Sequence, residues 1–389
     1  MFSAQAHFHL MAKPSSFHCN IKCEYCFYLE KEQFFSPNAE FMSDDTLRNY
    51  IKNYIQSHAA SQVDFAWQGG EPTLLGLDFF RKAVAYQQEF AQGKKITNAF
   101  QTNGIALNKQ WAHFFKENQF LIGISIDGLS DVHNKYRISV NGQPTFDRVK
   151  NAVQLLQDFA VDFNTLTVVN KQNFDKGRET YLALKELGST FMQFIPIVEK
   201  QTCGATTNFS VPLEGYGRFL LDVFNEWSKE DIGKIFVIEF DNLLGQWLGY
   251  PSSSCVHQPT CGASMVVEAN GDVYSCDHFV YPEYKVGNLN QQSLAEIAQS
   301  APQRQFGQQK KSTLTPVCLN CDLRPICHGG CPKHRIVPLS TQAPPSQKTH
   351  LHNYLCPSYQ LFFRQTAPTM RKMSQIIRSG GSLQQFVMA

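Results

Sequence analysis

Residues 19–26 read Cys-Asn-Ile-Lys-Cys-Glu-Tyr-Cys, which places Cys19, Cys23 and Cys26 on one short loop. Three thiolates can bind three irons of a four-iron cluster and leave the fourth iron open for chemistry. A zinc site would need a fourth ligand, for which His18 is a candidate, but structural zinc sites usually show C-x2-C twice or together with a histidine pair. The spacing therefore favours an iron–sulfur cluster over zinc.

An open iron can be chelated by an amine and a carboxylate, which are the groups at the methionyl end of S-adenosylmethionine. An electron passed through the cluster then breaks the carbon–sulfur bond and yields a 5′-deoxyadenosyl radical. Tyr25 lies between the last two cysteines and is expected next to the adenine. The three-cysteine loop therefore indicates radical chemistry.

Eight further cysteines stand near the C-terminus, and eight thiolates can close two more clusters completely. Spacing alone does not divide them between two clusters, but in two-cluster ferredoxins the last cysteine of a run binds the other cluster. By that logic Cys331 leaves its run. The expected groups are Cys255, Cys261, Cys276 and Cys331 for one cluster, and Cys318, Cys321, Cys327 and Cys356 for the other. Two structural zincs are the alternative, and the twelfth cysteine, Cys203, is expected to be an ordinary thiol.

Composition excludes several other classes of protein. Of 389 residues, 43% are hydrophobic, and 35 basic residues nearly cancel 33 acidic ones, which leaves no electrostatic case for nucleic acid. No apolar run reaches the roughly 18–20 residues of a membrane helix, and the first residues do not resemble a secretory signal. We therefore expect a cytoplasmic protein. Disulfides do not explain its cysteines there, because the cytosol keeps thiols reduced.

The first part of the chain alternates strand-like and helix-like segments. The expected strands are 8–13, 63–68, 96–102, 120–127, 163–170 and 191–198, and the expected helices are 44–58, 77–91, 108–117, 145–159, 174–187 and 213–227. Six strand–helix units in series predict a parallel sheet with right-handed crossovers, compatible with a partial (β/α) barrel. In such barrels the chemistry lies at the C-terminal ends of the strands.

The candidate motifs stand at those strand ends. Besides the three-cysteine loop they are Gly69-Gly70-Glu71-Pro72, Gln101-Thr102-Asn103-Gly104 and Ser125-Ile126-Asp127-Gly128. Gly70 lies where backbone close to a ligand must lack a Cβ, although Gly-Gly-Glu-Pro alone is also an ordinary turn. Ser125, Asp127 and Arg137 could reach the cofactor's ribose and carboxylate, and ordinary loop hydrogen bonding is the alternative.

From about Pro251 the character changes, because cysteine, glycine, proline and histidine become frequent and helical periodicity weakens. We expect three parts: a core over 1–235, a small metal-held domain over 236–363 and a helical tail over 364–389. Residues 303–313 are expected to be a polar connector.

Taken together, these residues resemble the radical S-adenosylmethionine (SAM) superfamily. More narrowly they resemble the anaerobic sulfatase-maturating enzymes with their C-terminal SPASM domain. The resemblance extends from residue 8 to about 359. It rests on Cys19–Tyr28, on the eight C-terminal cysteines and on the segments Trp67–Pro72, Gln101–Gly104, Ser125–Gly128 and Tyr274–His278. It implies an α/β fold, a partial (β/α)6 TIM-like barrel of the radical SAM type, followed by a small iron–sulfur domain. It also supports the proposed division of the eight cysteines.

The resemblance implies an enzyme that oxidises a cysteine or serine of a sulfatase, in a Cys/Ser-x-Pro-x-Arg segment, to Cα-formylglycine. Its cofactors would be three [4Fe-4S] clusters and S-adenosylmethionine. The catalytic cluster would be held by Cys19, Cys23 and Cys26. The SAM-binding residues would be Tyr25, Gly70, Ser125, Arg137 and Ile195, and the substrate pocket would be lined by Tyr28 and Gln68. The expected partners are an unfolded or nascent sulfatase and a flavodoxin- or ferredoxin-type electron donor, with the enzyme a monomer.

In the expected mechanism the radical removes a hydrogen atom from Cβ, Asp277 takes the proton from the thiol or hydroxyl, and the remaining electron leaves to an auxiliary cluster. Asp277 follows Cys276, so the negative charge of a cluster is expected to raise the pKa of Asp277. The alternative is that Asp277 merely caps a turn. Two other functions stay open: a SPASM peptide maturase that forms crosslinks, and a non-catalytic metal-binding scaffold.

Overall fold

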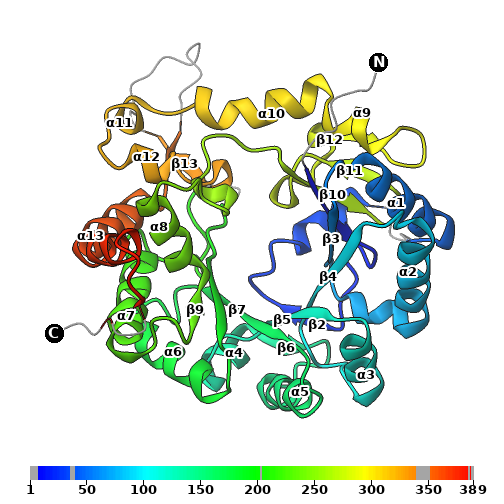
Figure 1. Ribbon diagram of the computed structural model, residues 1–389, viewed down its shortest axis with the longest axis horizontal. Coiled ribbons are helices and arrows are strands. Elements are labelled where there is room, and N and C mark those ends of the chain that lie inside the picture. Colours follow the sequence, from blue (N-terminus) through cyan, green and yellow to red (C-terminus); the bar gives the residue numbers. More distant parts are fainter. Residues whose placement is uncertain (1–7, 36–39, 202–203, 339–350, 384–385, 387–389) are drawn as a thin grey trace. The chain divides into compact units, whose positions relative to one another are not determined.

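The computed structural model describes residues 8–35, 40–201, 204–338, 351–383 and 386 (Figure 1). Contacts divide the chain into two compact units, each assembled from several segments. The first unit takes its described residues from 1–125, 134–163 and 262–307, and the second takes its own from 126–133, 164–261 and 308–389. Cys203, expected to be an ordinary thiol, lies outside the described residues.

The first unit contains a sheet with the strand order β12-β11-β10-β1-β3-β4-β5. Its strands are β1 (His9–Lys13), β3 (Gln62–Trp67), β4 (Lys95–Thr102), β5 (Phe120–Ser125), β10 (Ser264–Glu268), β11 (Asp272–Tyr274) and β12 (Lys285–Asn288). The pairs from β10 through β1, β3 and β4 to β5 are parallel, and β11 and β12 add antiparallel strands. A short antiparallel pair, β2 (Ile21–Cys23) with β6 (Arg137–Ser139), holds the cysteine loop.

The helices of this unit are α1 (Asp44–Ser57), α2 (Gly76–Phe90), α3 (Lys109–Glu117), α5 (Phe146–Asp158) and α9 (Leu294–Ala298). Ser43 caps α1 by accepting a hydrogen bond from the Thr46 amide, which satisfies one of the unpaired amides of the first turn. The buried aromatic residues Phe65, Trp67 and Phe100 alternate along β3 and β4, so each strand turns one face into the core.

The second unit contains the parallel strands β7 (Phe163–Val169), β8 (Phe191–Pro196) and β9 (Phe236–Val237). Its longer helices are α6 (Gly177–Glu186), α7 (Gly215–Glu230), α8 (Ile238–Leu248) and α13 (Cys356–Arg378). Close packing of α13 on α7 depends on Gly217, because a Cβ there would lie 2.4 Å from the Ser358 carbonyl oxygen. The short elements α11 (Pro316–Leu319), α12 (Arg324–Cys327), β13 (Arg335–Val337) and β14 (His352–Asn353) complete this unit, while α4 (Ser130–Tyr136) and α10 (Ala301–Ser312) have residues in both.

The alternation of strands and helices predicted from the sequence is confirmed, with bounds within a few residues of those expected. One expectation is wrong: residues 303–313 are not a connector, because most of them form helix α10. Its buried positions Gln303, Phe306 and Lys310 recur at helical spacing, but two of them are polar, so the apolar pattern is missing. Among the described residues, no helix is long and apolar enough to span a membrane.

Candidate functional site

The three-cysteine loop follows β1, at the C-terminal end of that strand, as predicted. In the β2–β6 pair Cys23 lies opposite Arg137, whose guanidinium lies 5.3 Å from the centre of the Tyr25 ring. The Tyr25 ring also contacts Tyr136, at 5.3 Å between centroids. Two of the predicted SAM-binding residues, Tyr25 and Arg137, are therefore neighbours beside the cysteines.

Burial makes two thiols of this loop harder to ionise. It raises the pKa of Cys19 to about 11 and also raises the pKa of Cys26, and in Cys26 the charges of Lys13 and Arg137 act in the opposite direction. A metal that binds the thiolate removes this cost of ionisation, and nearby cations favour the thiolate form. The donor set and its charges therefore fit an iron–sulfur cluster.

Gly70 lies against the backbone just before the first cysteine. A Cβ on Gly70 would lie 2.0 Å from the carbonyl oxygen of His18, and the Gly70 amide donates to the Ser16 carbonyl at 2.6 Å. The neighbouring Glu71 is buried and accepts hydrogen bonds from Thr73 and Thr102 side chains and from the Asn103 amide. This motif thus holds the cysteine loop in place. Gly70 is needed for that close packing, besides its predicted role in binding the cofactor.

Residues of the other two strand-end motifs form hydrogen bonds at the ends of β4 and β5, and Asn103 reaches the cysteine loop. Asn103 Nδ2 donates to Asn20 Oδ1 at 2.7 Å and lies 3.7 Å from Cys19 Sγ. At the end of β5, the hydroxyl of Ser125 accepts a hydrogen bond of 3.0 Å from Gln101 Nε2. Gln68 follows β3, and its amide donates to the Ala12 carbonyl at 2.8 Å, next to Lys13.

Lys13 and Asp277 form an ion pair between two residues that lie far apart in the sequence. Lys13 is the last residue of β1, its side chain is 2% exposed, and its ammonium lies 3.9 Å from the centre of the Tyr28 ring. Both Lys13 and Asp277 act electrostatically on Cys26. A carboxylate with an ammonium partner therefore lies close to the proposed catalytic cluster.

The protein's own charges act against the expected rise in the Asp277 pKa. Burial would raise this pKa, but the charges of Lys13, His278 and Lys31 outweigh burial and hold it below its usual value. Cys276 is a neighbour of Asp277 in the sequence, whereas the buried Lys13 becomes its neighbour only through the fold. An ionised carboxylate is the form that accepts a proton.

A second buried carboxylate, Glu268, completes this polar cluster. It is the last residue of β10 and lies opposite Lys13 in the parallel β1–β10 pair. Tyr28 donates its hydroxyl hydrogen to Glu268 Oε1, and Ser16 Oγ donates to Oε2 at 2.9 Å. Burial raises the pKa of Glu268 to about 7, so this carboxyl is partly protonated near neutral pH.

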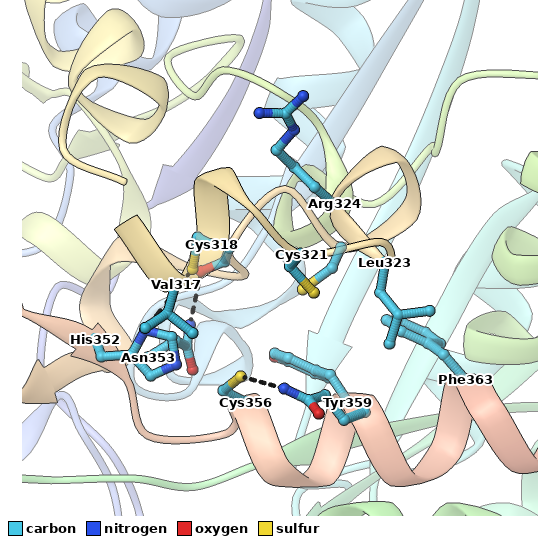
Figure 2. Close-up of a pocket in the computed structure, with 13 residues that line it drawn as sticks. Val317, Cys318, Cys321, Leu323, Arg324, His352, Asn353, Cys356, Tyr359 and Phe363 are labelled. Carbon is cyan, nitrogen blue, oxygen red and sulfur yellow. Dashed lines mark hydrogen bonds between the residues drawn. The ribbon is translucent and has the colours of Figure 1, made fainter. Parts of the chain in front are cut away.

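Four of the eight C-terminal cysteines line one pocket in the second unit. We call Cys318, Cys321, Cys327 and Cys356 auxiliary group II. Figure 2 shows Cys318, Cys321 and Cys356 around the same space. His352 Nδ1 lies 3.7 Å from Cys318 Sγ, and Gln360 Nε2 donates to Cys356 Sγ at 3.4 Å. The lining includes Leu323, Tyr359 and Phe363, so the thiols face an apolar space that suits a cluster.

Three other cysteines of the second unit form auxiliary group I, namely Cys255, Cys261 and Cys331. Burial raises the pKa of Cys331 to about 12, and the charges of Cys255 and Cys261 raise it further. By contrast, the thiols that act on Cys327 are those of Cys356, Cys318 and Cys321. Two of the three thiols that the sequence grouped with Cys331 are therefore its electrostatic neighbours. Cys276, the predicted fourth ligand, belongs to the first unit.

Among the described side chains, no three histidines, cysteines or acids converge as the ligands of a single ion would.

Two predicted residues lie in the second unit. Ile195 is in β8, where it pairs with Val168 of β7. Asp127 Oδ1 accepts a hydrogen bond from the Val168 amide at 3.0 Å, the ordinary loop interaction that was the alternative for this residue. The sequence argument missed Lys13 and Glu268. An acidic residue that follows the apolar run Met265–Val267 was the available signal for Glu268.

The chain is similar to known proteins, and two family models define its class. The radical SAM superfamily matches residues 14–184, and an iron–sulfur cluster-binding domain, SPASM, matches residues 255–322. A serine-type anaerobic sulfatase-maturating enzyme of Bacteroides thetaiotaomicron is 40% identical over 383 residues, covering 94% of this chain and 91% of the relative. A cysteine-type enzyme of Clostridium novyi is 32% identical, covering 91% and 94%. The chain thus belongs to the family of anaerobic sulfatase-maturating enzymes.

A solved structure supports this placement. The native enzyme anSMEcpe with bound AdoMet and the Cp18Cys peptide has a TM-score of 0.84 and 32% identity, covering 95% of this chain and 99% of that one. The predicted resemblance and fold class, a partial (β/α) barrel of the radical SAM type with an iron–sulfur domain, are therefore confirmed. So is the prediction of a radical SAM enzyme. Streptococcus suis SuiB, at 17% identity and a TM-score of 0.62, shares the fold alone.

Proposed function

We propose that this protein oxidises a serine or cysteine side chain of a sulfatase to Cα-formylglycine without oxygen. The relatives named above support the reaction, and the observation that carries it is the ion pair of Asp277 with Lys13 close to Cys26. Serine is the expected preference, because the 40% identity to a serine-type relative exceeds the 32% identity to a cysteine-type one.

The cofactor sites follow from the residues present. We assign Cys19, Cys23 and Cys26 to the catalytic cluster, and Tyr25, Gly70, Ser125, Arg137 and Ile195 to S-adenosylmethionine. Auxiliary groups I and II each hold one cluster, with Cys276 assigned to group I from the sequence. When bound, S-adenosylmethionine and the clusters would supply the radical chemistry at Cβ and a place for the remaining electron. We also propose that the radical SAM core ends at about residue 235 and the iron–sulfur domain at about residue 363.

The chain's own residues handle the proton and the substrate. Oxidation of serine to the aldehyde removes one hydrogen atom, one proton and one electron, and Asp277 accepts the proton from the hydroxyl. Lys13 keeps Asp277 ionised, which is the form that a general base needs. Tyr28 and Gln68 line the substrate pocket, and Glu268 holds the Tyr28 hydroxyl in place.

The partners of the proposal are a sulfatase polypeptide and a flavodoxin- or ferredoxin-type electron donor. Cluster thiolates need a reducing compartment, so we place the reaction in the cytoplasm. All proposed site residues belong to one polypeptide, so a monomer suffices.

The test is anaerobic incubation of the protein with S-adenosylmethionine, a reductant and a peptide bearing Ser-x-Pro-x-Arg, followed by mass spectrometry. We expect formylglycine together with 5′-deoxyadenosine and methionine. Asp277→Asn should cleave S-adenosylmethionine but form little aldehyde, whereas full aldehyde yield would remove Asp277 from the mechanism. A crosslinked peptide in place of the aldehyde would instead indicate another kind of peptide maturase.

A further inference from the structure

Two buried cations lie beside the auxiliary cysteines of the second unit. Lys310, near the end of α10, is 0% exposed, and its ammonium donates to the carbonyl oxygens of Cys255 at 2.6 Å and of Val256 at 2.9 Å. Burial lowers the pKa of Lys310, and the thiols of Cys261, Cys331 and Cys255 act in the opposite direction. The charge of Lys310 is thus directed at auxiliary group I.

Arg335 interacts with both groups. Its Nη1 donates to Thr313 Oγ1 at 2.8 Å and its Nε to the Gly329 carbonyl at 3.4 Å. The thiols that act on it electrostatically are those of Cys318, Cys261, Cys331 and Cys327, which belong to both groups. A guanidinium remains charged at neutral pH, so this positive charge is permanent.

One nitrogen of Arg335, Nη2, is a buried donor that has no acceptor among the described residues. A buried donor without an acceptor is costly, and guanidinium donors pair best with anionic acceptors. The sulfur atoms of an anionic cluster are acceptors of that kind, and hydrogen bonds to sulfur are among the factors that set cluster potentials.

The two groups differ in the charges around them. Auxiliary group I is faced by Lys310 and Arg335, and of these two cations only Arg335 faces group II. Arg324 also lines the pocket of group II, where its Nη1 donates to the Leu319 carbonyl at 2.9 Å. Near group II, Asp322 lies 3.8 Å from Cys321 Sγ, and Arg364 binds that carboxylate at 2.8 Å and 2.9 Å, so these two charges offset each other. A reduced cluster carries one more negative charge than an oxidised one, and a nearby cation therefore stabilises the reduced form.

We propose that Lys310 and Arg335 make the cluster of auxiliary group I the more easily reduced of the two auxiliary clusters. Lys310 acts on group I only, whereas Arg335 acts on both groups. The inference rests on the proposed assignment of the cysteines. Of the two auxiliary clusters, that of group I is then the one on which the electron from the substrate comes to rest.

The test is a potentiometric titration, monitored by electron paramagnetic resonance, of the full-length chain with Cys19, Cys23 and Cys26 replaced by alanine. Only the auxiliary clusters then contribute signals. In this background Lys310→Met should lower the higher of the two midpoint potentials and leave the other unchanged. Arg335→Met should lower both, and Arg335→Lys, which keeps the charge without the fork of donors, should lower both less.

The matched control is Lys311→Met, because Lys311 is exposed on the same helix and its loss should move neither potential. Equal effects of Lys310→Met and Lys311→Met would overturn the proposal, and so would unchanged potentials in Arg335→Met. If Arg335→Met fails to load iron, Arg335→Lys and Lys310→Met still decide. Iron content distinguishes a failure of the cluster assignment from a failure of the inference about potentials. Fewer than about eight irons per chain in the parent variant would refute the cluster assignment itself.

Discussion

Lys13 pairs with Asp277 in a setting where the lysine has almost no contact with solvent. The pair forms because β1 and β10 are parallel neighbours, and β10 pairs in turn with β11, the strand that leads to Cys276. An unpaired carboxylate in such a site would be costly, and the lysine offsets that cost. Most of the chemistry proposed here depends on this contact.

Lys13→Met should therefore uncouple radical formation from product formation. Without the ammonium, burial favours the protonated form of Asp277, which cannot accept the substrate proton. We expect formylglycine formation to fall roughly 100-fold, the scale of general base catalysis, while 5′-deoxyadenosine is still released. Lys22→Met removes an exposed lysine of the cysteine loop and should behave as wild type. Undiminished aldehyde yield in Lys13→Met would show that Asp277 needs no such partner.

The contrast between what was predicted and what was missed has a physical basis. The strand–helix alternation and the cysteine spacings are local patterns, and a local pattern can be recognised in a sequence without knowing the fold. The Lys13–Asp277 pair is not local, because it depends on which strand neighbours β1. A lysine at the end of a strand carries no signal of its own.

Helix α10 was missed for a related reason. Its buried face includes Gln303, which donates to the Gly262 and Ser275 carbonyls, and Lys310, which donates to the Cys255 carbonyl. Polar residues buried for their hydrogen bonds have no hydrophobic periodicity, so the pattern that identifies amphipathic helices is absent.

Glu268 should make stability depend on pH. Its pKa is about 7 in the folded protein against an ordinary value of 4.5, so between these values the folded state holds a proton that the unfolded state releases. The contribution is fully present below pH 4.5 and is lost as the pH rises through 7, at a cost of roughly 3 kcal/mol at most.

Glu268→Gln replaces the titrating group with a neutral one of similar shape. The variant should match wild type in thermal unfolding at pH 4 and be the more stable of the two at pH 8.5. Glu283→Gln, at an exposed position, should follow wild type throughout. A constant difference between Glu268→Gln and wild type across this range would show that Glu268 does not titrate there.

Gly70→Ala should damage the catalytic cluster site through backbone geometry. The added Cβ would lie 2.0 Å from the His18 carbonyl oxygen, and backbone cannot rotate away as a side chain can. We expect a loss of about 1–3 kcal/mol, the usual scale of overpacking, and reduced iron at the three-cysteine loop. Gly245→Ala is the matched control, because Gly245 lies in α8 with open space around it and alanine favours helix by up to about 1 kcal/mol. Thermal unfolding and iron analysis of both variants measure the contrast, and a Gly70→Ala protein that retains full iron would contradict it.

The assignment of Cys331 can be tested by asking which cysteines act as a unit. Substitutions of two ligands of the same cluster do not have additive effects on iron content, because a cluster that is already lost cannot be lost again. Wild type should carry about twelve irons per chain, and Cys331→Ser should lose about four. Adding Cys261→Ser should change little, because both thiols belong to auxiliary group I, whereas adding Cys327→Ser should remove about four more. Cys203→Ser should retain all of the iron. If the doubles show the reverse pattern, Cys331 belongs with Cys327, and the electrostatic grouping of the thiols misleads about the ligands.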